Sequence, residues 1–241
     1  MGQKKLIMEQ ELLTKLNQEF KGKSLNEAFD ALIKLNYGTI AFSTSFGQED
    51  QVITDFVFRN NYPIKVFTLD TGRLFEETYE VYHRTVKKYD KLIEPYFPDA
   101  KKIEALLAKK GPNSFYSSIE NRKECCSIRK IDPLQKALKG VDIWVTGLRG
   151  GQSHFRENFD LFQFDNSFGL IKFNPLIDWS LEEVEEYLLQ YNVPQNRLHK
   201  KKYISIGCAP CTRPIEDGED LRAGRWWWEN SKKECGLHQK D

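Results

Sequence analysis

The chain has 241 residues, the size of one domain or of one domain with a short extension, and can bury a core without disulfides or metal. Lys and Arg (36) nearly balance Asp and Glu (35), and the net charge of +1 offers a nucleic-acid partner little attraction. With 40% hydrophobic and 29% charged residues, and no apolar run of the roughly 18 residues that a membrane span needs, the composition excludes membrane, fibrous and disordered classes.

Helices and strands alternate along most of the chain. Apolar residues at three- and four-residue spacing predict helices, two of them opened by capping boxes at Ser24 and Ser180, over residues 6–20, 24–35, 48–58, 74–89, 100–110, 127–138 and 180–189. Short β-type runs predict strands over residues 39–43, 64–69, 91–94 and 141–146, and a hairpin over 161–165 and 170–174. This alternation indicates an α/β fold, a mostly parallel open sheet with helices on both faces and the hairpin at its edge. We predict a nucleotide-binding domain over residues 1–212 and a flexible C-terminal tail over 213–241.

The N-terminus and the cysteines indicate a compartment. The first twenty residues alternate charged and apolar side chains, unlike a secretory signal, and we expect a cytoplasmic protein. Cysteines in a reducing compartment serve more often as ligands or nucleophiles than in disulfides. The five cysteines here form two pairs and a single residue, namely Cys125 with Cys126, Cys208 with Cys211, and Cys235.

Three of the predicted strands end in turns rich in small, hydroxyl and arginine residues. The turns read STSFGQED at residues 43–50, LDTGR at 69–73 and TGLRGGQS at 146–153, and Arg156 follows the third. The carboxyl ends of parallel strands meet at one sheet edge, where helix N-termini and arginines bind phosphate or sulfate. The first turn lacks the Gly-Lys pair of a P-loop, and alone it is equally compatible with an ordinary strand–helix connection. Three such turns in one sheet favour a site for a nucleotide or a sulfated nucleotide.

The two cysteine pairs lie about 80 residues apart and supply four thiolates. Four ligands suit either a tetrahedral zinc ion or an iron–sulfur cluster. Adjacent cysteines are an awkward pair for one zinc ion but could bind two irons of a cubane. The alternative is a buried free pair with a separate redox-active C-x-x-C unit.

The tail carries a second group of chemically active residues. It reads GEDLRAGRWWWE at residues 218–229 and ECGLH at 234–238. The three Trp residues predict an aromatic surface that docks the tail, which would direct Arg222 and Arg225 to an anion. Cys235 has no cysteine partner, and nearby cations would lower its pKa and make it a nucleophile. The alternative is a surface thiol on a frayed terminus.

Taken together, these segments resemble the assimilatory adenylylsulfate reductases, over residues 38–238. The resemblance rests on the first two turns, on KECC followed by Arg129 and Lys130, on the C-x-x-C unit, and on RAGRWWW through ECGLH. It implies an adenine-nucleotide alpha hydrolase-like fold and a [4Fe-4S] cluster on Cys125, Cys126, Cys208 and Cys211. It also implies thioredoxin-dependent reduction of adenylylsulfate to sulfite and AMP in sulfate assimilation, with Cys235 as the nucleophile. One residue departs from the pattern, because Gly150 stands where the family commonly carries Arg.

The substrate residues that we predict form three groups. Ser43, Ser45 and Gly47 hold the phosphate end, and Leu69, Gly72 and Arg73 line the nucleoside side. Lys130, Arg149, Arg156, Arg222 and Arg225 surround the phosphosulfate. Gly147 and His238 complete the set, the latter without a defined role. We expect thioredoxin as a transient partner, a homo-oligomer, and neither nucleic acid nor membrane as a partner.

Three other functions compete with this prediction. A reductase of 3′-phosphoadenylylsulfate, or an enzyme of dual specificity, is the nearest; cluster-free members of that group lack the four paired cysteines. An ATP pyrophosphatase such as a tRNA-thiolating enzyme typically carries Ser-Gly-Gly-x-Asp-Ser at the first turn, which this chain does not. A zinc-stabilised binding module would leave Cys235 and the arginines without a role.

Overall fold

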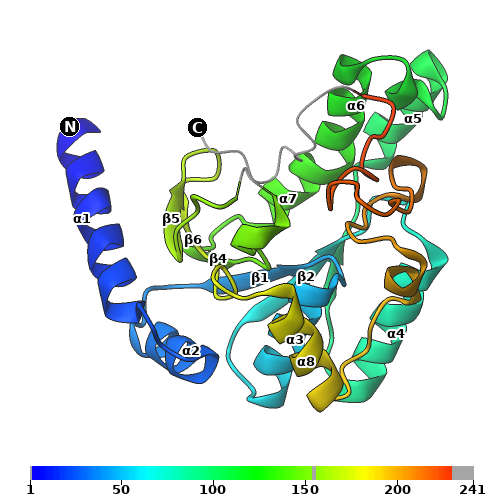
Figure 1. The fold of residues 1–241 in the computed structure, drawn as a ribbon. Coiled ribbons are helices and arrows are strands. Elements are labelled where there is room, and N and C mark those ends of the chain that lie inside the picture. Colours follow the sequence, from blue (N-terminus) through cyan, green and yellow to red (C-terminus); the bar gives the residue numbers. More distant parts are fainter. Residues whose placement is uncertain (1, 154–155, 230–241) are drawn as a thin grey trace.

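The computed structural model describes residues 2–153 and 156–229, with side chains from residue 10 onward (Figure 1). Its strands form a six-stranded sheet in the order β3-β2-β1-β4-β6-β5. The strands are β1 (Ile40–Thr44), β2 (Lys65–Leu69), β3 (Glu94–Tyr96), β4 (Ile143–Val145), β5 (Phe162–Asp165) and β6 (Leu170–Phe173). All neighbouring strands are parallel except β5 and β6, which form the antiparallel hairpin at one edge. The predicted α/β class and the edge hairpin are confirmed.

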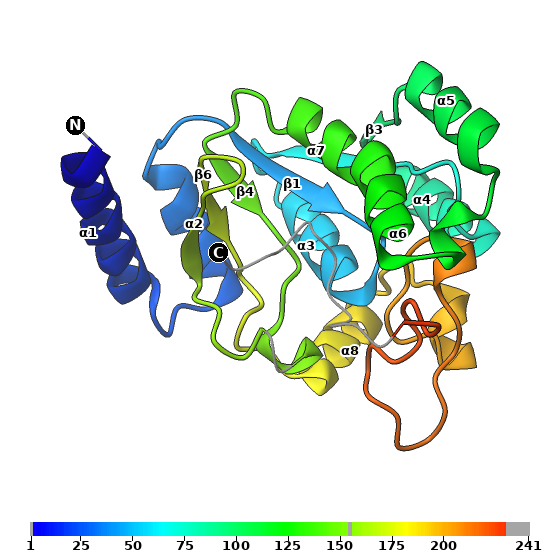
Figure 2. The same cartoon turned by 90° about the horizontal axis from the view of Figure 1, so that it is seen from above.

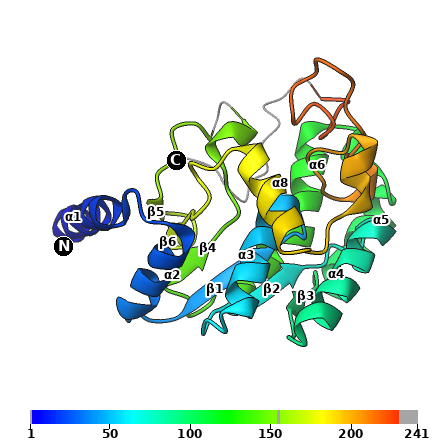
Figure 3. The same ribbon diagram turned by 60° about the horizontal axis from the view of Figure 1, so that its bottom comes forward.

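Helices cover both faces of the sheet. The described helices are α1 (Gly2–Phe20), α2 (Leu25–Lys34), α3 (Gln48–Arg59), α4 (Glu76–Tyr89), α5 (Ala100–Lys110), α6 (Ile119–Cys126), α7 (Asp132–Ala137) and α8 (Leu181–Gln190). Helices α2, α3, α4 and α8 lie across one face (Figure 3), and α7 packs on the other, with α5 and α6 beyond it (Figure 1). None of the described helices is long and apolar enough to cross a membrane.

Two predicted elements differ from those observed. The strand expected over residues 91–94 lies instead at Glu94–Tyr96, where it pairs in parallel with β2. The helix expected over residues 127–138 is the end of a longer helical segment, in which α6 runs into a π-helical turn (Ser127–Ile131) and then into α7. Cys125 and Cys126 therefore lie at the end of a helix that the sequence analysis did not predict, rather than just before one.

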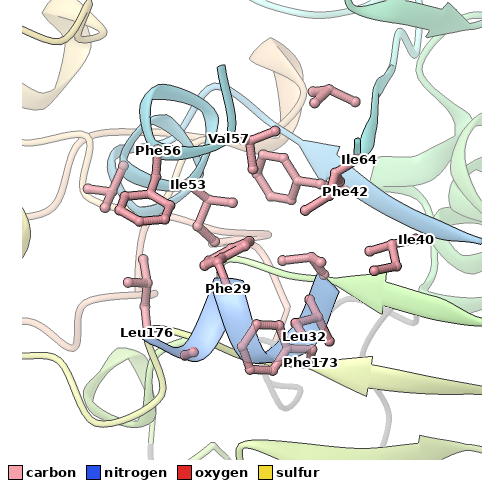
Figure 4. Close-up of a cluster of buried hydrophobic side chains, with 14 of the residues drawn as sticks. Phe29, Leu32, Ile40, Phe42, Ile53, Phe56, Val57, Ile64, Phe173 and Leu176 are labelled. Carbon is pink, nitrogen blue, oxygen red and sulfur yellow. The ribbon is translucent and has the colours of Figure 1, made fainter. Parts of the chain in front are cut away.

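The larger core lies between the sheet and helices α2, α3 and α8, which cover one of its faces. Phe29 of α2 is fully buried, and its ring lies 5.2 Å from that of Phe56 on α3 and 5.7 Å from that of Phe173 on β6 (Figure 4). A smaller cluster on the opposite face joins Trp144 of β4 to Leu134 of α7. Burial of apolar side chains on both faces fixes the sheet, and with it the positions of the strand ends.

The C-terminal segment that the structure describes, residues 202–229, packs beside the carboxyl ends of the central strands. The backbone of Arg213 pairs with that of Gly224, and Thr212 forms a β-bridge with Arg225. Seen from above, β1 points toward this orange and red segment (Figure 2). The described part of the predicted tail, residues 213–229, is thus packed on the body. Cys235 and His238 lie outside the described residues.

Candidate active site

The first turn joins β1 to α3 through a left-handed residue. Phe46 has φ +61° and is almost fully buried, with its ring stacked 4.9 Å from that of Tyr82. Gly47 then caps α3 without a side-chain hydrogen bond. The first N–H groups of a helix have no partner within it, and its dipole favours an anion at this end. The turn therefore presents the amino end of α3 to the space beyond β1.

Two acidic residues in the first turn of α3 are already engaged. The backbone N–H and the hydroxyl of Ser45 both donate to Asp50 Oδ2, at 2.6 Å each. Burial raises the pKa of Asp50 to about 6, and the hydrogen bonds from Ser45 oppose that rise. Glu49 accepts a hydrogen bond of 3.2 Å from Nε of Arg149, which stands in the third turn. The Asp50 carboxylate thus stabilises the first turn itself, and the Glu49 carboxylate links the first turn to the third.

The third turn follows β4 and approaches α3 at a glycine. A Cβ added to Gly147 would lie 2.0 Å from Asp50 Oδ1 and 3.2 Å from the Asp50 backbone nitrogen, so a side chain here would displace the carboxylate. The Gly150 nitrogen donates to the Ile177 carbonyl at 2.8 Å, and a Cβ on Gly150 would lie 3.2 Å from that oxygen. Glycine at both positions allows the third turn to approach its neighbours closely.

The second turn, after β2, faces two ways. The Asp70 carboxylate accepts hydrogen bonds from the Gly72 nitrogen and the Tyr79 hydroxyl. Arg73 turns away from the other strand ends: its guanidinium donates to Pro112 and Asn113 and lies 5.0 Å from the centre of the Phe115 ring. Only the Leu69 and Thr71 side of this turn reaches the same space as the first and third turns.

That space is a cavity of about 250 Å³ at the carboxyl ends of β1, β2 and β4. Ten of the predicted substrate residues line it: Ser43, Ser45, Gly47, Leu69, Lys130, Gly147, Arg149, Arg156, Arg222 and Arg225. Gly72 and Arg73, which were predicted with them, are not in its lining. The four arginines are each at most 7% exposed, although they are far apart in sequence. The arrangement concentrates positive charge in a largely buried space, as a site for an anionic ligand requires.

The cavity also contains residues that the sequence analysis did not single out. Nε1 of Trp144 donates a hydrogen bond of 2.8 Å to Ser43 Oγ, and Ser205 Oγ accepts one from Arg222 at 3.2 Å and one from Arg225 at 3.3 Å. His199 lines the wall, and burial lowers its pKa, which favours a neutral imidazole at pH 7. Trp144 lies in the strand predicted over residues 141–146, whereas His199 and Ser205 lie between the last predicted helix and the C-x-x-C unit, where no element was predicted.

The four paired cysteines converge on a second, smaller cavity. Cys125 and Cys126 at the end of α6 and Cys208 and Cys211 from the C-terminal segment all line it, as free thiols. Burial raises the pKa of Cys211 to about 12, with Cys208 and Cys126 adding to the rise. Lys130 lines this cavity and the larger one.

The lining of this second cavity can be compared with what a metal cluster requires. As arranged, no group of three or more His, Cys, Asp or Glu side chains in the described part of the chain could hold a metal ion. The walls nonetheless bring together four thiols and four cationic side chains, those of Arg73, Arg122, Arg129 and Lys130. Four thiolates around a [4Fe-4S]²⁺ core carry a net charge of about −2, which these cations would offset. The residues present therefore fit such a cluster in ligand type, number and charge.

Comparison with known proteins places the chain in a class of reductases. Residues 39–214 match the family described as phosphoadenosine phosphosulfate reductase domain. The chain belongs to this family, and the resemblance found in its sequence is confirmed. The chain is 49% identical to adenosine 5′-phosphosulfate reductase of Rhizobium meliloti, over 86% of this chain and 79% of that protein. It is 45% identical to the enzyme of the same name from Sinorhizobium fredii (strain USDA 257), over 94% of each chain.

Solved structures agree on the fold. The crystal structure of a phosphoadenylyl-sulfate reductase from Candida auris superposes with a TM-score of 0.73 at 27% identity, covering 85% of this chain and 97% of that one. An FMN adenylyltransferase from Candida glabrata superposes with a TM-score of 0.54 at 19% identity, covering 96% of this chain and 78% of that one. At that identity the likeness extends to the fold alone.

Asp50 gives the site a testable dependence on pH. Its native pKa of about 6 lies above the ordinary value of 3.8, so the native state binds this proton more tightly than the unfolded chain does. The stability that Asp50 contributes is therefore fully present below pH 3.8 and is lost as the pH rises through about 6. We expect the free energy of unfolding of the wild type to fall by about 3 kcal/mol more than that of Asp50→Asn across this window. Urea unfolding at a series of pH values measures it, and parallel profiles would show that Asp50 titrates normally.

Proposed function

We propose that this protein reduces adenylylsulfate (adenosine 5′-phosphosulfate) to sulfite and AMP in assimilatory sulfate reduction, with thioredoxin as the electron donor. The observation that carries the proposal is the meeting of three strand-end turns with Arg222 and Arg225 around one cavity. Relatives named adenosine 5′-phosphosulfate reductase, at 45% and 49% identity, support the same substrate. The cytoplasm is the proposed compartment, because its reducing conditions keep thiols free.

The proposed substrate position follows the lining of the cavity. The phosphate lies at the amino end of α3, beside Ser43, Ser45 and Gly47, where helix dipole and N–H groups favour an anion. The nucleoside extends along Leu69 of the second turn. The phosphosulfate faces the arginines from the third turn and the C-terminal segment, with Lys130 beside them. Arg73 is assigned to the cysteine cavity, since its guanidinium lies among the residues of that wall.

The four paired cysteines are proposed to hold a [4Fe-4S] cluster. When bound, the cluster would supply charge and shape next to the substrate cavity rather than electrons, because a thiol can carry out the two-electron chemistry. Lys130 lines both cavities and would link the two electrostatically. Thr71, which carries no charge, also lies between the two sites: its hydroxyl is 3.3 Å from Cys208 Sγ, and the residue lines the substrate cavity.

The proposed mechanism begins at Cys235. Its thiolate attacks the sulfate sulfur, and as the new S–S bond forms, the bond to the bridging oxygen breaks and AMP leaves with the electron pair. The arginines of the cavity neutralise the charge on sulfate and on departing AMP. A thioredoxin thiolate then attacks the Cys235 sulfur of the S-sulfocysteine, releasing sulfite, and its second thiol restores Cys235 while thioredoxin becomes a disulfide.

The nearest alternative is reduction of 3′-phosphoadenylylsulfate. The Candida auris enzyme named for that substrate is 27% identical to this chain, whereas the adenosine 5′-phosphosulfate reductases are 45% and 49% identical. The higher identities favour the unphosphorylated nucleotide. Sulfite release by the anaerobically purified protein with each nucleotide separates the two.

The expected homo-oligomer stays a prediction.

The covalent step has a direct test. Incubation with ³⁵S-labelled adenylylsulfate in the absence of reductant is expected to leave one sulfite-mass adduct per chain, on the peptide that contains Cys235. Cys235→Ser is expected to abolish both adduct and turnover. Peptide mass spectrometry locates the label. An adduct on another cysteine, or turnover by the Ser variant, would contradict the mechanism.

The metal proposal has a separate test. We expect elemental analysis of anaerobically purified protein to find iron and acid-labile sulfide in near-equal amounts. Cys208→Ser removes one of the four ligands and should lower both, while Cys235→Ser is the matched control that should leave both unchanged. Stoichiometric zinc without iron would show that the site holds a different metal.

A further inference from the structure

A buried ion pair joins the helix of the adjacent cysteines to the C-terminal segment. Arg122 lies one turn before Cys125 on α6, and its Nε and Nη2 donate to the two carboxylate oxygens of Glu229 at 3.0 and 2.9 Å. The two side chains are 6% and 3% exposed. Burial of two charges is costly, and it is offset here by two parallel charge-assisted hydrogen bonds. Neither residue lines the substrate cavity; Arg122 lines the cysteine cavity, and the function proposed above gives Glu229 no role.

The ion pair holds the turn that carries Trp226. Trp226 is 1% exposed and has φ +43°, a left-handed conformation that is costly for a bulky residue and persists only where its surroundings impose it. Its backbone nitrogen donates to the Cys211 carbonyl, and its own carbonyl accepts from the Glu229 nitrogen at 2.9 Å. The Arg122 guanidinium also lies over the Trp226 ring, 4.7 Å from its centre. The pair thus fixes both the ring and the turn below it.

The same ring supports an arginine of the substrate cavity. The Arg225 guanidinium carbon lies 4.7 Å from the centre of the Trp226 ring. Arg225 also donates a 3.3 Å hydrogen bond to Ser205, and a Cβ on Gly207 would come within 2.4 Å of its Nη2, so the guanidinium lies close against that backbone. The place of Arg225 in the cavity therefore depends on the position of the ring.

We propose that Arg122 and Glu229 are positioning residues for Arg225, acting through Trp226. Contacts run from the Glu229 carboxylate to Arg122, from Arg122 to the ring, and from the ring to Arg225. The inference rests on the proposed function in one respect, that Arg225 faces the anionic end of the substrate. It adds that the helix ending in Cys125 and Cys126 holds this arginine in place, so that the cysteine site and the substrate cavity share one support.

A mutant cycle tests the inference with ADP, an unreactive nucleotide whose terminal phosphate stands in for the sulfate. Calorimetric titration of the full-length protein is expected to show that Glu229→Gln weakens ADP binding on the order of tenfold, as does Arg225→Ala. If the two residues act through one contact chain, Glu229→Gln has little further effect once Arg225 is Ala. Glu219→Gln is the matched control, because it disrupts a bidentate Arg213–Glu219 ion pair in the same segment, and neither residue of that pair lines the substrate cavity. We expect it to leave ADP affinity unchanged.

The outcomes separate this inference from the proposed function. Equal losses from Glu229→Gln with and without Arg225 would overturn the inference, as would an unchanged affinity in Glu229→Gln alone. If Arg225→Ala itself binds ADP as the wild type does, the proposed substrate position fails instead. Thermal unfolding by circular dichroism checks that each variant is folded. Should Glu229→Gln not fold, Arg122→Lys takes its place in the cycle, since it retains the charge but loses the planar fork.

Discussion

The site depends on the direction of three neighbouring parallel strands. The chain passes from β1 outward to β2 and β3 on one side, and then returns to β4 and β6 on the other. The connections that follow β1 and β4 therefore diverge, and a crevice opens where the strand order reverses. Turns that are about a hundred residues apart in sequence meet there. Gly147 lies against Asp50 because these two strand ends are adjacent.

Part of the charge in the crevice is paired before any ligand arrives. Although the chain has a net charge of only +1, four arginines that are at most 7% exposed gather around one cavity. Glu49 pairs with Arg149. Burial raises the pKa of the Asp50 carboxyl, and the positive charge of the nearby Arg156 opposes part of that rise. Such pairs hold guanidinium groups in fixed positions and lower the cost of burying them. An anionic substrate then meets donors that need little reorganisation, which favours both binding and the neutralisation of developing charge.

Features that depend on residues close together in the chain were predicted well from the sequence, and features that depend on long-range contacts were not. The capping boxes at Ser24 and Ser180 are present as expected, because both partners lie within one helical turn. The edge strand β3 was placed too early, because its register is set by pairing with β2 rather than by its own composition. Helix α6 has a mostly polar sequence, IENRKECC, with no apolar periodicity to mark it.

The site residues divide in the same way, into those that a local motif predicted and those that depend on contacts between distant parts of the chain. Motifs at strand ends account for seven of the ten predicted residues that line the cavity, counting Arg156 after the third turn, because topology alone brings these ends together. The other three, Lys130, Arg222 and Arg225, were predicted from the segment after the adjacent cysteines and from the tail. The direction of a side chain within a motif was not predictable: Arg73 stands beside Gly72 in the second turn, yet its guanidinium reaches Asn113 and the cysteine wall. The pairing of Arg122 with Glu229 joins residues 107 positions apart, and no pattern around either one indicates the other.

One cavity, at the ends of β1, β2 and β4, is proposed to bind the nucleotide. Hydrogen–deuterium exchange with and without AMP tests it most directly, because exchange reports each backbone segment separately. We expect AMP to slow exchange at the first turn (residues 44–50), at the third turn (146–152) and in the segment around Arg222. Helix α1 and strand β3, which lie away from the cavity, should be unaffected. Protection confined to α1 or β3, or none at the first turn, would contradict the account.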